Sequence, residues 1–480
     1  KSRIGVNPIY ADGKIFFVSA SMELVVLSAN DFSLIWSKKF DTSISRRGFL
    51  YHKDTNSNQG YIFINSGSYL HKINANNGNL IKNFGDNGST DVGIVQIPPV
   101  VYKNEVIISS IVDSEIVSVD YSTGKKNYSV KINENDVYAN PWGGAALDEK
   151  NGLYYTVVGN PKPGTSGINR PGENKNANSI VAFDIKKKKI IWTFQDVIHD
   201  LWDFDLSAPP ILADIKIENF IIPSVIVTTK TGNTYIFERT TGKSVFDIKY
   251  MSTISSDIPN EVASPLQPKP IKPKSFSKID FEMKDLRKNL SQDEKFLKEF
   301  EQNNVFGWYQ PPSLGKNVVF FGVKGGNNWW GSAYNPINQS LYIPANHIPY
   351  KIRTFVKSNE RKNSGYEKLN FYQLYADKCS SCHGATRNGK YEKIQGYDIL
   401  KNYIPSLVGL TSLDQLKYKL KSYSDLKKMH SKNLNLTQEE YLKIVSLFKK
   451  WDSKVIKDNN LYFDSDWEEF FADDGVLISS

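Results

Sequence analysis

Three carboxylates, a histidine and a tryptophan fall within seven consecutive residues of this chain. The segment His199–Asp205 reads HDLWDFD and lies between two strand-like runs, 190–194 and 220–227. Crowded carboxylates repel one another unless a cation or a proton separates them. The segment therefore predicts a metal site or a proton-transfer site, and an acidic surface loop is the alternative that composition leaves open.

Lys230 stands 27 positions after Asp203, within the polar run Thr228–Asn233. This pairing resembles the active-site signature of the PQQ (pyrroloquinoline quinone) dehydrogenases, in particular the branch that oxidises sugars. The resemblance implies that Asp203 is the catalytic base and that Lys230 donates to the quinone oxygens. Alcohol oxidation needs a base within hydrogen-bond reach of the hydroxyl, and the cofactor accepts the hydride. A lone lysine in a turn would otherwise be taken for a surface residue.

The same resemblance assigns further residues to the quinone pocket. Trp142 resembles the tryptophan on which PQQ stacks, although an isolated tryptophan more often belongs to the core. Arg47 and His52 fall in an Arg-Gly-x-x-Tyr-His segment similar to that of the membrane glucose dehydrogenase branch, where the histidine lies by the quinone. Asn328 and Trp329 are expected to complete the pocket.

A metal ion is expected beside the quinone. The resemblance implies that Asp203, the amide oxygen of Asn160 and the carboxylate of Asp113 bind it. Hard oxygen ligands of this kind suit Ca²⁺ or Mg²⁺ and not zinc.

Cys379 and Cys382 are the two cysteines of the chain, and His383 follows them in a Cys-x-x-Cys-His run. This run is the attachment signature of c-type haem: two thioethers hold the porphyrin and the histidine ligates the iron. A structural zinc site would need four ligands. A thioredoxin-like motif would need a βαβ context, and a disulfide would not explain the histidine. The run therefore predicts covalent haem c.

The sixth iron ligand must come from further along the chain. Met429 is the one methionine after Cys382 and resembles the cytochrome c ligand, with the adjacent His430 as the competing candidate. The resemblance implies that electrons pass from PQQ through haem c to an external acceptor, a cytochrome or a quinone. Covalent haem attachment also implies an extracytoplasmic, periplasmic location.

A weak repeat organises the first half of the chain. Its equivalent positions are 46, 46, 64 and 54 residues apart, at Ala29, Ala75, Tyr121, Ile185 and Arg239. Asn-Gly and Thr-Gly pairs supply tight turns, and a period in the forties with short strands predicts propeller blades. Unrelated hairpins are the alternative. The resemblance implies a mainly β fold, an eight-bladed quinoprotein propeller with a degraded docking motif.

The composition changes after this repeat. From Ser256 to about Asn304 the repeat is interrupted, and a surface excursion is expected; within it, 265–274 is Pro/Lys-rich and 292–302 is expected to be helical. A further helix is expected over 366–376. A capping box of Thr437 and Glu440 opens an amphipathic helix that runs to about residue 451.

These changes predict the domain organisation. A PQQ-binding propeller is expected over 1–356, a linker over 357–365, an all-α cytochrome c domain over 366–452, and a segment returning to the propeller over 453–480. The propeller is expected to be incomplete, because its first strand and final blade are not recognisable. We therefore expect a chain truncated at both ends.

The composition narrows the class of partner. The 480 residues are 40% hydrophobic and 13% aromatic, with a net charge of +9, as suits a mainly β protein with a large core. Basic runs without interleaved aromatics argue against nucleic acid, and no apolar run approaches the ~20 residues that span a bilayer. We expect PQQ-dependent oxidation of a small sugar, polyol or alcohol. The alternative is a noncatalytic propeller scaffold beside an electron-carrying cytochrome.

Overall fold

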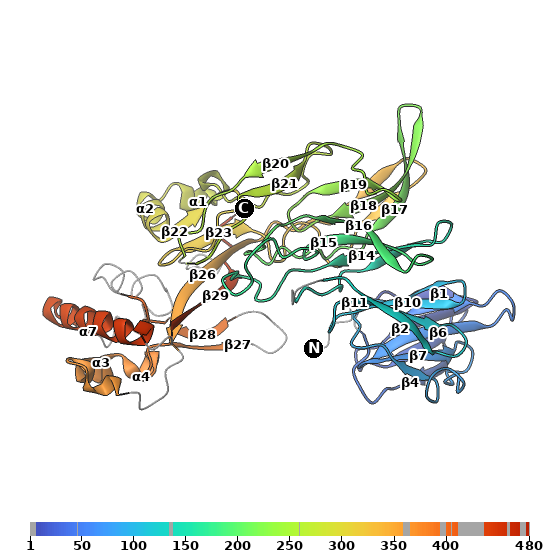
Figure 1. Ribbon diagram of the computed structural model, residues 1–480, viewed down its shortest axis with the longest axis horizontal. Helices are drawn as coiled ribbons and strands as arrows, with labels where there is room; N and C mark the ends of the chain where they lie inside the picture. Colours follow the sequence, from blue (N-terminus) through green and yellow to red (C-terminus); the bar gives the residue numbers. More distant parts are fainter. Residues whose placement is uncertain are drawn as a thin grey trace.

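The computed structural model describes residues 6–45, 47–133, 138–258, 260–358, 365–393, 400–404, 406–410, 436–457, 461–470 and 477–479. Small antiparallel sheets follow one another along the chain, and a group of helices lies to one side of them (Figure 1). The mainly β, propeller-like fold that the repeat predicts is confirmed.

Four successive sheets form from strands that are neighbours in chain order. They are β1–β4 (Ile9–Ala11, Lys14–Val18, Leu24–Ser28, Leu34–Lys38), β5–β8 (Leu50–Lys53, Gly60–Ser66, Tyr69–Asn74, Ser89–Asp91), β9–β12 (Val100–Tyr102, Glu105–Ser110, Glu115–Asp120, Lys126–Lys131) and β13–β16 (Ala145–Asp148, Leu153–Val158, Ser179–Asp184, Lys189–Gln195).

The later sheets are smaller or less regular. They are β17–β19 (Ile211–Ile217, Phe220–Thr228, Thr234–Glu238), β20–β21 (Ile248–Ser252, Leu266–Pro270), β24–β25 (Ala333–Asn335, Ser340–Tyr342), β27–β28 (Lys390–Lys393, Leu400–Ile404) and β22-β23-β26-β29 (Asn304–Phe306, Asn317–Phe321, Pro349–Ser358, Leu461–Glu469). In the last sheet, β29 comes back from the helical segment to pair with β26.

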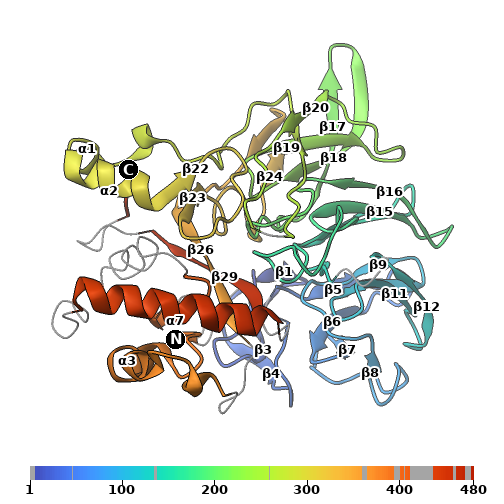
Figure 2. The same cartoon turned by 60° about the vertical axis from the view of Figure 1, so that its left-hand side comes forward.

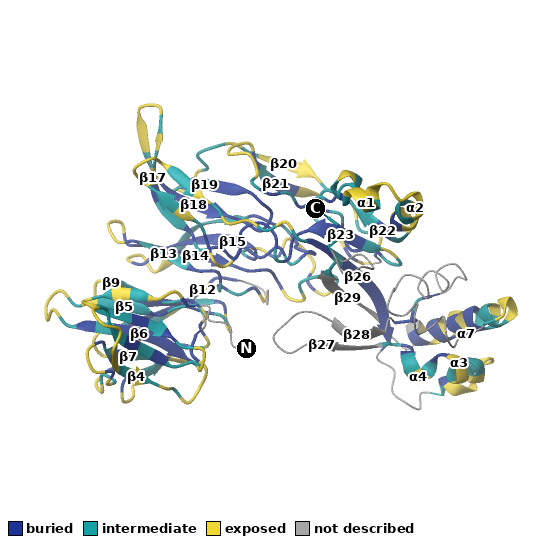
Figure 3. Cartoon of the chain, turned by 180° about the vertical axis from the view of Figure 1, so that it is seen from behind, coloured by how far each residue is buried: buried dark blue, intermediate teal, exposed yellow. Residues whose placement is uncertain are grey.

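The core lies between neighbouring sheets. The inner strands β14 and β15 are buried along their whole length, because apolar side chains on both faces meet an adjacent sheet. Between the third and fourth sheets, for example, Ile107 and Ile116 pack with Tyr154 and Val181. Figure 3 shows buried inner strands and exposed connecting loops. Burial on both faces fixes each sheet against its neighbours.

Tryptophans connect one repeat to the next. The indole Nε1 of Trp36, in the middle of β4, donates to the carbonyl of Ala75 at 3.2 Å. Trp192 donates in the same way to Arg239 at 2.9 Å. Both acceptors stand at positions that the sequence repeat marks as equivalent, so the docking contacts follow the repeat.

The Pro/Lys-rich stretch 265–274 contains a strand that its composition does not indicate: β21 forms within it and pairs with β20. Prolines are tolerated in this two-stranded sheet since a strand at a sheet edge needs only half of its backbone hydrogen bonds. The short elements η1 (Met283–Asp285) and α1 (Lys288–Ser291) follow, and α2 (Glu294–Asn303) confirms the expected helix.

The helical segment contains η2 (Tyr366–Lys368), α3 (Tyr372–Lys378), α4 (Ser380–His383) and α7 (Gln438–Lys457), with α7 lying along α3 (Figure 2). The helix expected over 366–376 is interrupted, because Phe371 has a φ of +70°. The capping box is confirmed: Thr437 Oγ1 accepts from the Glu440 N–H at 3.2 Å, and Glu440 Oε2 accepts from the Thr437 N–H at 2.7 Å. Among the described helices, none has the length and apolar character to cross a bilayer.

Candidate active site

The HDLWDFD segment forms an irregular loop between β16 and β17. The Asp200 carboxylate folds it, accepting from the backbone N–H groups of Trp202 and Phe204, each at 2.8 Å. The Trp202 and Phe204 rings are buried in the core. This leaves Asp203 on the other side of the loop, with a φ of +62°. A left-handed aspartate carries strain of the kind that collects at functional sites.

Lys230 enters the same site from the turn between β18 and β19. Its Nζ lies 2.8 Å from Asp205 Oδ2 and 3.6 Å from Asp203 Oδ2, and it donates to the Asp203 carbonyl at 2.9 Å. The lysine side chain is only 4% exposed. The structure therefore brings together the two residues that the 27-residue spacing selected.

Asp205 is the centre of this cluster. Its Oδ1 accepts from the backbone N–H of Asn160 at 2.8 Å and from the indole of Trp142 at 3.2 Å, while its Oδ2 faces Lys230. The side chain of Asn160 continues the network by donating from Nδ2 to Asp203 Oδ1 at 2.5 Å. The Asp205 carboxylate thus contacts three of the predicted site residues: Trp142, Asn160 and Lys230.

The two carboxylates differ in their affinity for a proton. Burial raises the pKa of Asp203 to about 6, with Lys230 opposing the shift and Asp205 reinforcing it. Burial also acts on Asp205, but Lys230 and the hydrogen bonds outweigh it and hold its pKa below the ordinary value. Burial would lower the pKa of Lys230, yet the two carboxylates raise it. Asp203 is therefore the carboxylate with the higher affinity for a proton, and Asp205 is the one that stays ionised beside Lys230.

Arg47 lies between two indole rings. Its guanidinium carbon is 4.1 Å from the centre of the Trp142 ring and 4.9 Å from that of Trp329. Burial lowers the pKa of Arg47 to about 10. Its NH1 atom is buried and, among the described residues, has no hydrogen-bond partner. An orphaned buried donor on a cation is suited to an anionic group.

Asn328 and Trp329 reach the site on the loop that follows β23. The Asn328 Oδ1 accepts from Ser207 Oγ at 3.3 Å and from the Trp329 N–H at 2.8 Å. The loop passes so close to the Lys230 turn that a Cβ at Gly326 would overlap the Lys230 carbonyl. Glycine is therefore needed at position 326 for the loop that carries Asn328 and Trp329 to pass this close to the lysine turn.

The expected cofactor can be tested against these contacts. The unpartnered Arg47 NH1 suits one of the carboxylates of PQQ, and Lys230 offers a buried ammonium to quinone oxygens. The face of Trp142 that Arg47 covers is closed to stacking, so the quinone would stack there only after the guanidinium moves. The donor set fits the cofactor, with Arg47 as the side chain that must adjust.

The expected metal ligands are partly assembled. Asp203 and Asn160 are in contact, although the amide turns its nitrogen toward Asp203 and receives Lys162 Nζ on its Oδ1 at 2.9 Å. Asp113 lies in the exposed turn between β10 and β11. Within the described residues, no three His, Cys, Asp or Glu side chains are grouped as a metal site. The oxygen donors present fit a hard cation in type, and half a turn of the Asn160 amide would aim its oxygen at Asp203.

His52 lies on β5 in a different environment. Its ring meets Tyr121 edge-on at 5.4 Å. Burial lowers its pKa, and the charges that act on it are those of Asp54, Lys72 and Glu149. The contacts described for His52 therefore differ from those of the Asp203 cluster.

The Cys-x-x-Cys-His run begins at Cys379, directly after α3, and includes all of α4. Cys379 and His383 are buried, Cys382 is partly exposed, and the two cysteines are not disulfide-bonded. Burial raises the pKa of the Cys379 thiol to about 12. The His383 N–H donates to the Cys379 carbonyl at 2.9 Å, which holds the run in one tight turn.

The candidate sixth ligands cannot be placed. Met429 and His430 lie outside the described residues. Behind the run, the buried Arg387 pairs with Asp452 of α7 at 2.6 Å. Asp452 also accepts from the Gly409 N–H at 3.0 Å, so the segment that follows the run is tied to the last helix.

Sequence reasoning missed two positioning groups. Asp205 was visible as the second acid of the Trp-Asp-Phe-Asp alternation, but only its contacts reveal that it is the centre of the cluster. The second group is a buried His199–Glu261 pair with Nε2 and Oε1 2.9 Å apart. Glu261 also accepts from the Gly167 N–H at 2.6 Å, and His199 Nδ1 donates to the Gly172 carbonyl at 2.6 Å. Glu261 lies 62 residues after His199 in the chain, and no local sequence motif indicates that the two residues pair.

Comparison with known proteins identifies the family of the chain. The family described as "PQQ: Glucose/ethanol/alcohol dehydrogenase, beta-propeller domain" matches residues 1–405. The glycerol dehydrogenase large subunit of Gluconobacter thailandicus is 26% identical over 297 residues, covering 56% of this chain and 40% of that protein. Quinoprotein glucose dehydrogenase A of Acinetobacter calcoaceticus is 25% identical over 420 residues, covering 72% and 51%. The chain thus spans about half or less of the length of these relatives.

A solved structure shares the fold. The crystal structure of quinohemoprotein alcohol dehydrogenase from Comamonas testosteroni aligns with 77% of this chain and 55% of that one. The TM-score is 0.53 and the sequence identity 17%, a likeness that concerns the fold alone.

Proposed function

The chain belongs to the PQQ-binding glucose/ethanol/alcohol dehydrogenase β-propeller family, and on that premise we propose that it oxidises the CH–OH group of a sugar, polyol or alcohol. The observation that carries the proposal is the buried cluster of Asp203, Lys230 and Asp205, in which one carboxylate is neutralised by the lysine and the other is left with a raised pKa. Asp203 thus supplies a proton acceptor, and Lys230 supplies a fixed cation beside it.

Asp203 is the proposed base. A carboxylate whose burial raises its pKa to about 6 is ionised near neutral pH and holds a proton better than an ordinary aspartate. It would accept the substrate hydroxyl proton while a hydride leaves the carbon. Lys162, whose Nζ is 3.9 Å from Asp203 Oδ1, lies where it can stabilise the ionised form.

PQQ, when bound, supplies the quinone that accepts the hydride. Lys230 would present its ammonium to the cofactor, and Arg47 would pair with a cofactor carboxylate. Trp142, Asn328 and Trp329 would form the walls of the pocket. His52 stays a predicted neighbour of the quinone.

Asp203 and Asn160 are the proposed protein ligands of a Ca²⁺ or Mg²⁺ ion. An ion of either kind polarises an adjacent oxygen and favours the ionised carboxylate. Asp113 remains a prediction from the resemblance.

We also propose that residues 366–452 form a cytochrome c domain, inserted between a propeller over 1–356 with linker 357–365 and a return segment over 453–480. Cys379 and Cys382 would attach haem c and His383 would ligate the iron, with Met429 ahead of His430 as the sixth ligand. The haem, once attached, supplies one-electron transfer to an external cytochrome or quinone. The proposed location is the periplasm, and the proposed complete propeller has eight blades.

The alternative of a noncatalytic scaffold has one observation in its favour, which is that Arg47 covers the Trp142 face at 4.1 Å. Binding of PQQ separates the two proposals. The enzyme proposal expects the full chain, reconstituted with Ca²⁺, to retain PQQ through gel filtration and to reduce an added dye with some member of a panel of aldoses, polyols and short alcohols. Absence of both retention and turnover would leave the scaffold.

A further inference from the structure

The loop between β14 and β15, residues 159–178, lies against Asp203 near its start. It carries Asn160, whose Nδ2 donates to Asp203 Oδ1 at 2.5 Å, and Lys162, whose Nζ is 3.9 Å from the same oxygen. A Cβ at Gly164 would lie 2.7 Å from Asn160 Nδ2 and 3.2 Å from Asp203 Oδ1, so the loop backbone itself passes close to this contact. The position of the loop therefore decides what surrounds the proposed base.

A buried carboxylate from another part of the chain holds the far end of this loop. Glu261 lies between β20 and β21, and its side chain is 2% exposed. Its Oε2 accepts from the Gly167 N–H at 2.6 Å, and its Oε1 is 2.9 Å from His199 Nε2. His199 Nδ1 in turn donates to the Gly172 carbonyl at 2.6 Å, and its backbone N–H donates to the Glu173 carbonyl at 3.2 Å. One pair thus holds three residues of the loop.

These hydrogen bonds fix how many protons the pair shares. A carbonyl can only accept, so His199 Nδ1 carries a proton. The contact between His199 Nε2 and Glu261 Oε1 needs one further proton, on one of the two atoms. The pair is therefore neutral as a whole, either as an imidazolium with a carboxylate or as an imidazole with a carboxylic acid. A glutamine at position 261 meets the same demands, with its oxygen facing Gly167 and its amide nitrogen donating to His199.

Arg170 connects the far end of the loop to its start. Its backbone N–H donates to the Gly167 carbonyl at 2.9 Å, and its Nε donates to the Pro163 carbonyl at 3.0 Å. Pro163 directly follows Lys162, so a displaced Gly167 would also displace the residue next to Lys162. The NH2 group of Arg170 donates to the carbonyl of Asp200, which ties the loop to the HDLWDFD segment as well.

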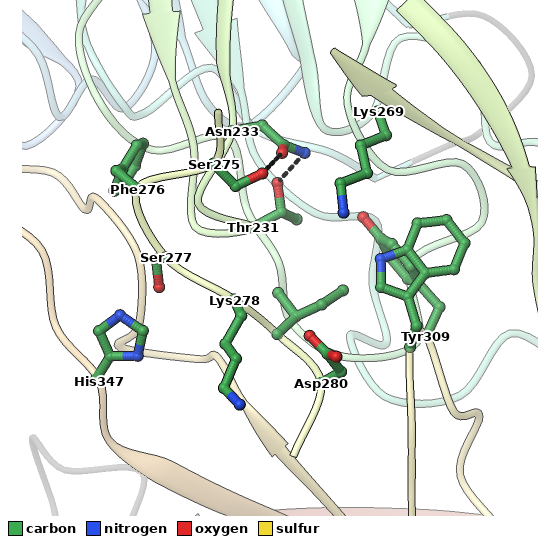
Figure 4. A pocket seen from close by; sticks show the side chains of 12 residues that line it. Thr231, Asn233, Lys269, Ser275, Phe276, Ser277, Lys278, Asp280, Tyr309 and His347 are labelled. Atoms are coloured by element: carbon green, nitrogen blue, oxygen red, sulfur yellow. Dashed lines mark hydrogen bonds between the residues drawn. The ribbon is translucent and has the colours of Figure 1, made fainter. Parts of the chain in front are cut away.

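The lysine side of the cluster is ordered by separate contacts. Figure 4 shows Asn233 between two hydroxyl groups: Ser275 Oγ donates to Asn233 Oδ1 at 2.9 Å, and Asn233 Nδ2 donates to Thr231 Oγ1 at 3.0 Å. These hydrogen bonds order the turn that carries Lys230 and involve no residue of the β14–β15 loop. A change at Glu261 should therefore reach the site through the loop.

We propose that Glu261 is a positioning residue for the proposed oxidation, acting through the β14–β15 loop on the surroundings of Asp203. Without this carboxylate the buried N–H of Gly167 loses its acceptor, which costs more than the hydrogen bond itself contributes. The loop should then loosen, and its contacts with Asp203 should loosen with it. The effect on catalysis rests on the proposed function, whereas the hold on the loop can be measured without cofactor or turnover.

The backbone N–H of Asn160 reports the site end of the loop, because it donates to Asp205 Oδ1 at 2.8 Å. Its exchange with solvent can be followed by residue-resolved hydrogen–deuterium exchange in the cofactor-free full chain. Glu261→Ala should speed exchange about tenfold at both Gly167 and Asn160. Glu261→Gln should leave both within about twofold of the parent protein, because glutamine keeps both contacts of the carboxylate.

A second variant disturbs the loop and leaves the pair in place. In Gly167→Ala the added Cβ would overlap His199 Nε2 and lie 2.6 Å from Glu261 Oε1. The loop must then move off the pair, so exchange at Asn160 should rise as it does in Glu261→Ala. This variant tests the proposal even where loss of the buried carboxylate prevents folding.

The catalytic consequence is measured on the protein loaded with PQQ and Ca²⁺. Glu261→Ala and Gly167→Ala should each lower kcat about tenfold with a smaller change in KM, and Glu261→Gln should restore most of the loss. The matched control is Asp148→Ala, which removes another buried carboxylate, 3.5 Å from Arg239. It should lower the melting temperature and leave both kcat and the exchange of Asn160 unchanged.

Two results would overturn the proposal. In the first, Glu261→Ala speeds exchange at Gly167 and not at Asn160, so the pair holds only its own end of the loop. In the second, Glu261→Gln is as slow as Glu261→Ala although its exchange matches that of the parent. A parent protein that is inactive with every substrate, yet shows the expected exchange pattern, would reject the proposed function and keep the hold of Glu261 on the loop.

Discussion

Lys230 and Asp205 form a buried ion pair, with 2.8 Å between Nζ and Oδ2, while Asp203 stays 3.6 Å from the same nitrogen. The charge of Lys230 therefore stabilises the ionised form of Asp205 more than that of Asp203. Asp203 is left as the carboxylate with the higher affinity for a proton. The chemistry proposed for the site depends on this unequal sharing.

Replacing the proposed base is the first test of this arrangement. Asp203→Asn keeps the shape of the side chain but cannot accept a proton, so kcat/KM should fall about 10²–10⁴-fold in steady-state assays of the reconstituted protein. Asp214→Asn, which removes an exposed acid from β17, should change kcat/KM little. Equal activity of Asp203→Asn and the parent protein would exclude Asp203 as the base.

The pKa of Asp203 should depend on Asp205. In the cofactor-free and metal-free protein, NMR titration of the carboxyl carbons should give Asp203 a pKa of about 6. In Asp205→Asn, a like charge is lost and Lys230 becomes free to pair with Asp203. Both changes favour the ionised carboxylate, so the pKa should fall. A pKa that rises in this variant would show that the two carboxylates do not compete for Lys230.

A buried lysine away from the site makes stability depend on pH. Lys72 Nζ lies 3.8 Å from the centre of the Tyr121 ring and 4.4 Å from that of Tyr61. Burial lowers its pKa to about 8. Between this value and the higher pKa of an unfolded lysine, the unfolded chain binds more protons, so stability rises with pH.

The test compares urea unfolding of the parent protein and Lys72→Met. From pH 7.5 to 10 the parent should gain about 1–3 kcal/mol relative to the variant. If the difference between the two proteins does not change with pH, the buried lysine keeps an ordinary pKa.

The docking of one repeat onto the next depends on glycine. Gly78 has a φ of +74°, and a Cβ there would lie 2.8 Å from the Trp36 ring. Gly78→Ala should cost about 2–4 kcal/mol of unfolding free energy, from backbone strain and overpacking together. Gly13 has a similar φ of +69° with nothing near its Cβ position, so Gly13→Ala should cost only the backbone part, about 1–2 kcal/mol. Equal costs at the two positions would exclude the tryptophan contact as a source of stability.

The propeller-like fold could be predicted from the sequence because the repeat consists of residues that determine local structure. Turn glycines and tryptophans recur at fixed offsets, and the contacts of Trp36 and Trp192 follow those offsets. The capping box at Thr437 is equally local. β21 was missed because its pairing with β20 depends on the position of both strands at a sheet edge, which the proline-rich composition obscured.

The site was predictable to the extent that its residues belong to one short motif or one spacing. Asp203, Lys230, Asn160 and Trp142 were named from the sequence and meet in the structure. The central role of Asp205 was not predictable, because it consists of contacts between loops far apart in the chain. The closure of Arg47 over Trp142 could not be read from spacing either, since it depends on side-chain packing.

The measurement that tests the central proposal most directly is the visible spectrum of the full chain, produced with haem maturation and loaded with PQQ and Ca²⁺. One member of the sugar, polyol and alcohol panel is added without any dye. The proposal expects the reduced c-type bands to grow with that substrate and to stay absent in Asp203→Asn. Haem bands that remain oxidised with every substrate, in a protein that retains PQQ, would contradict it.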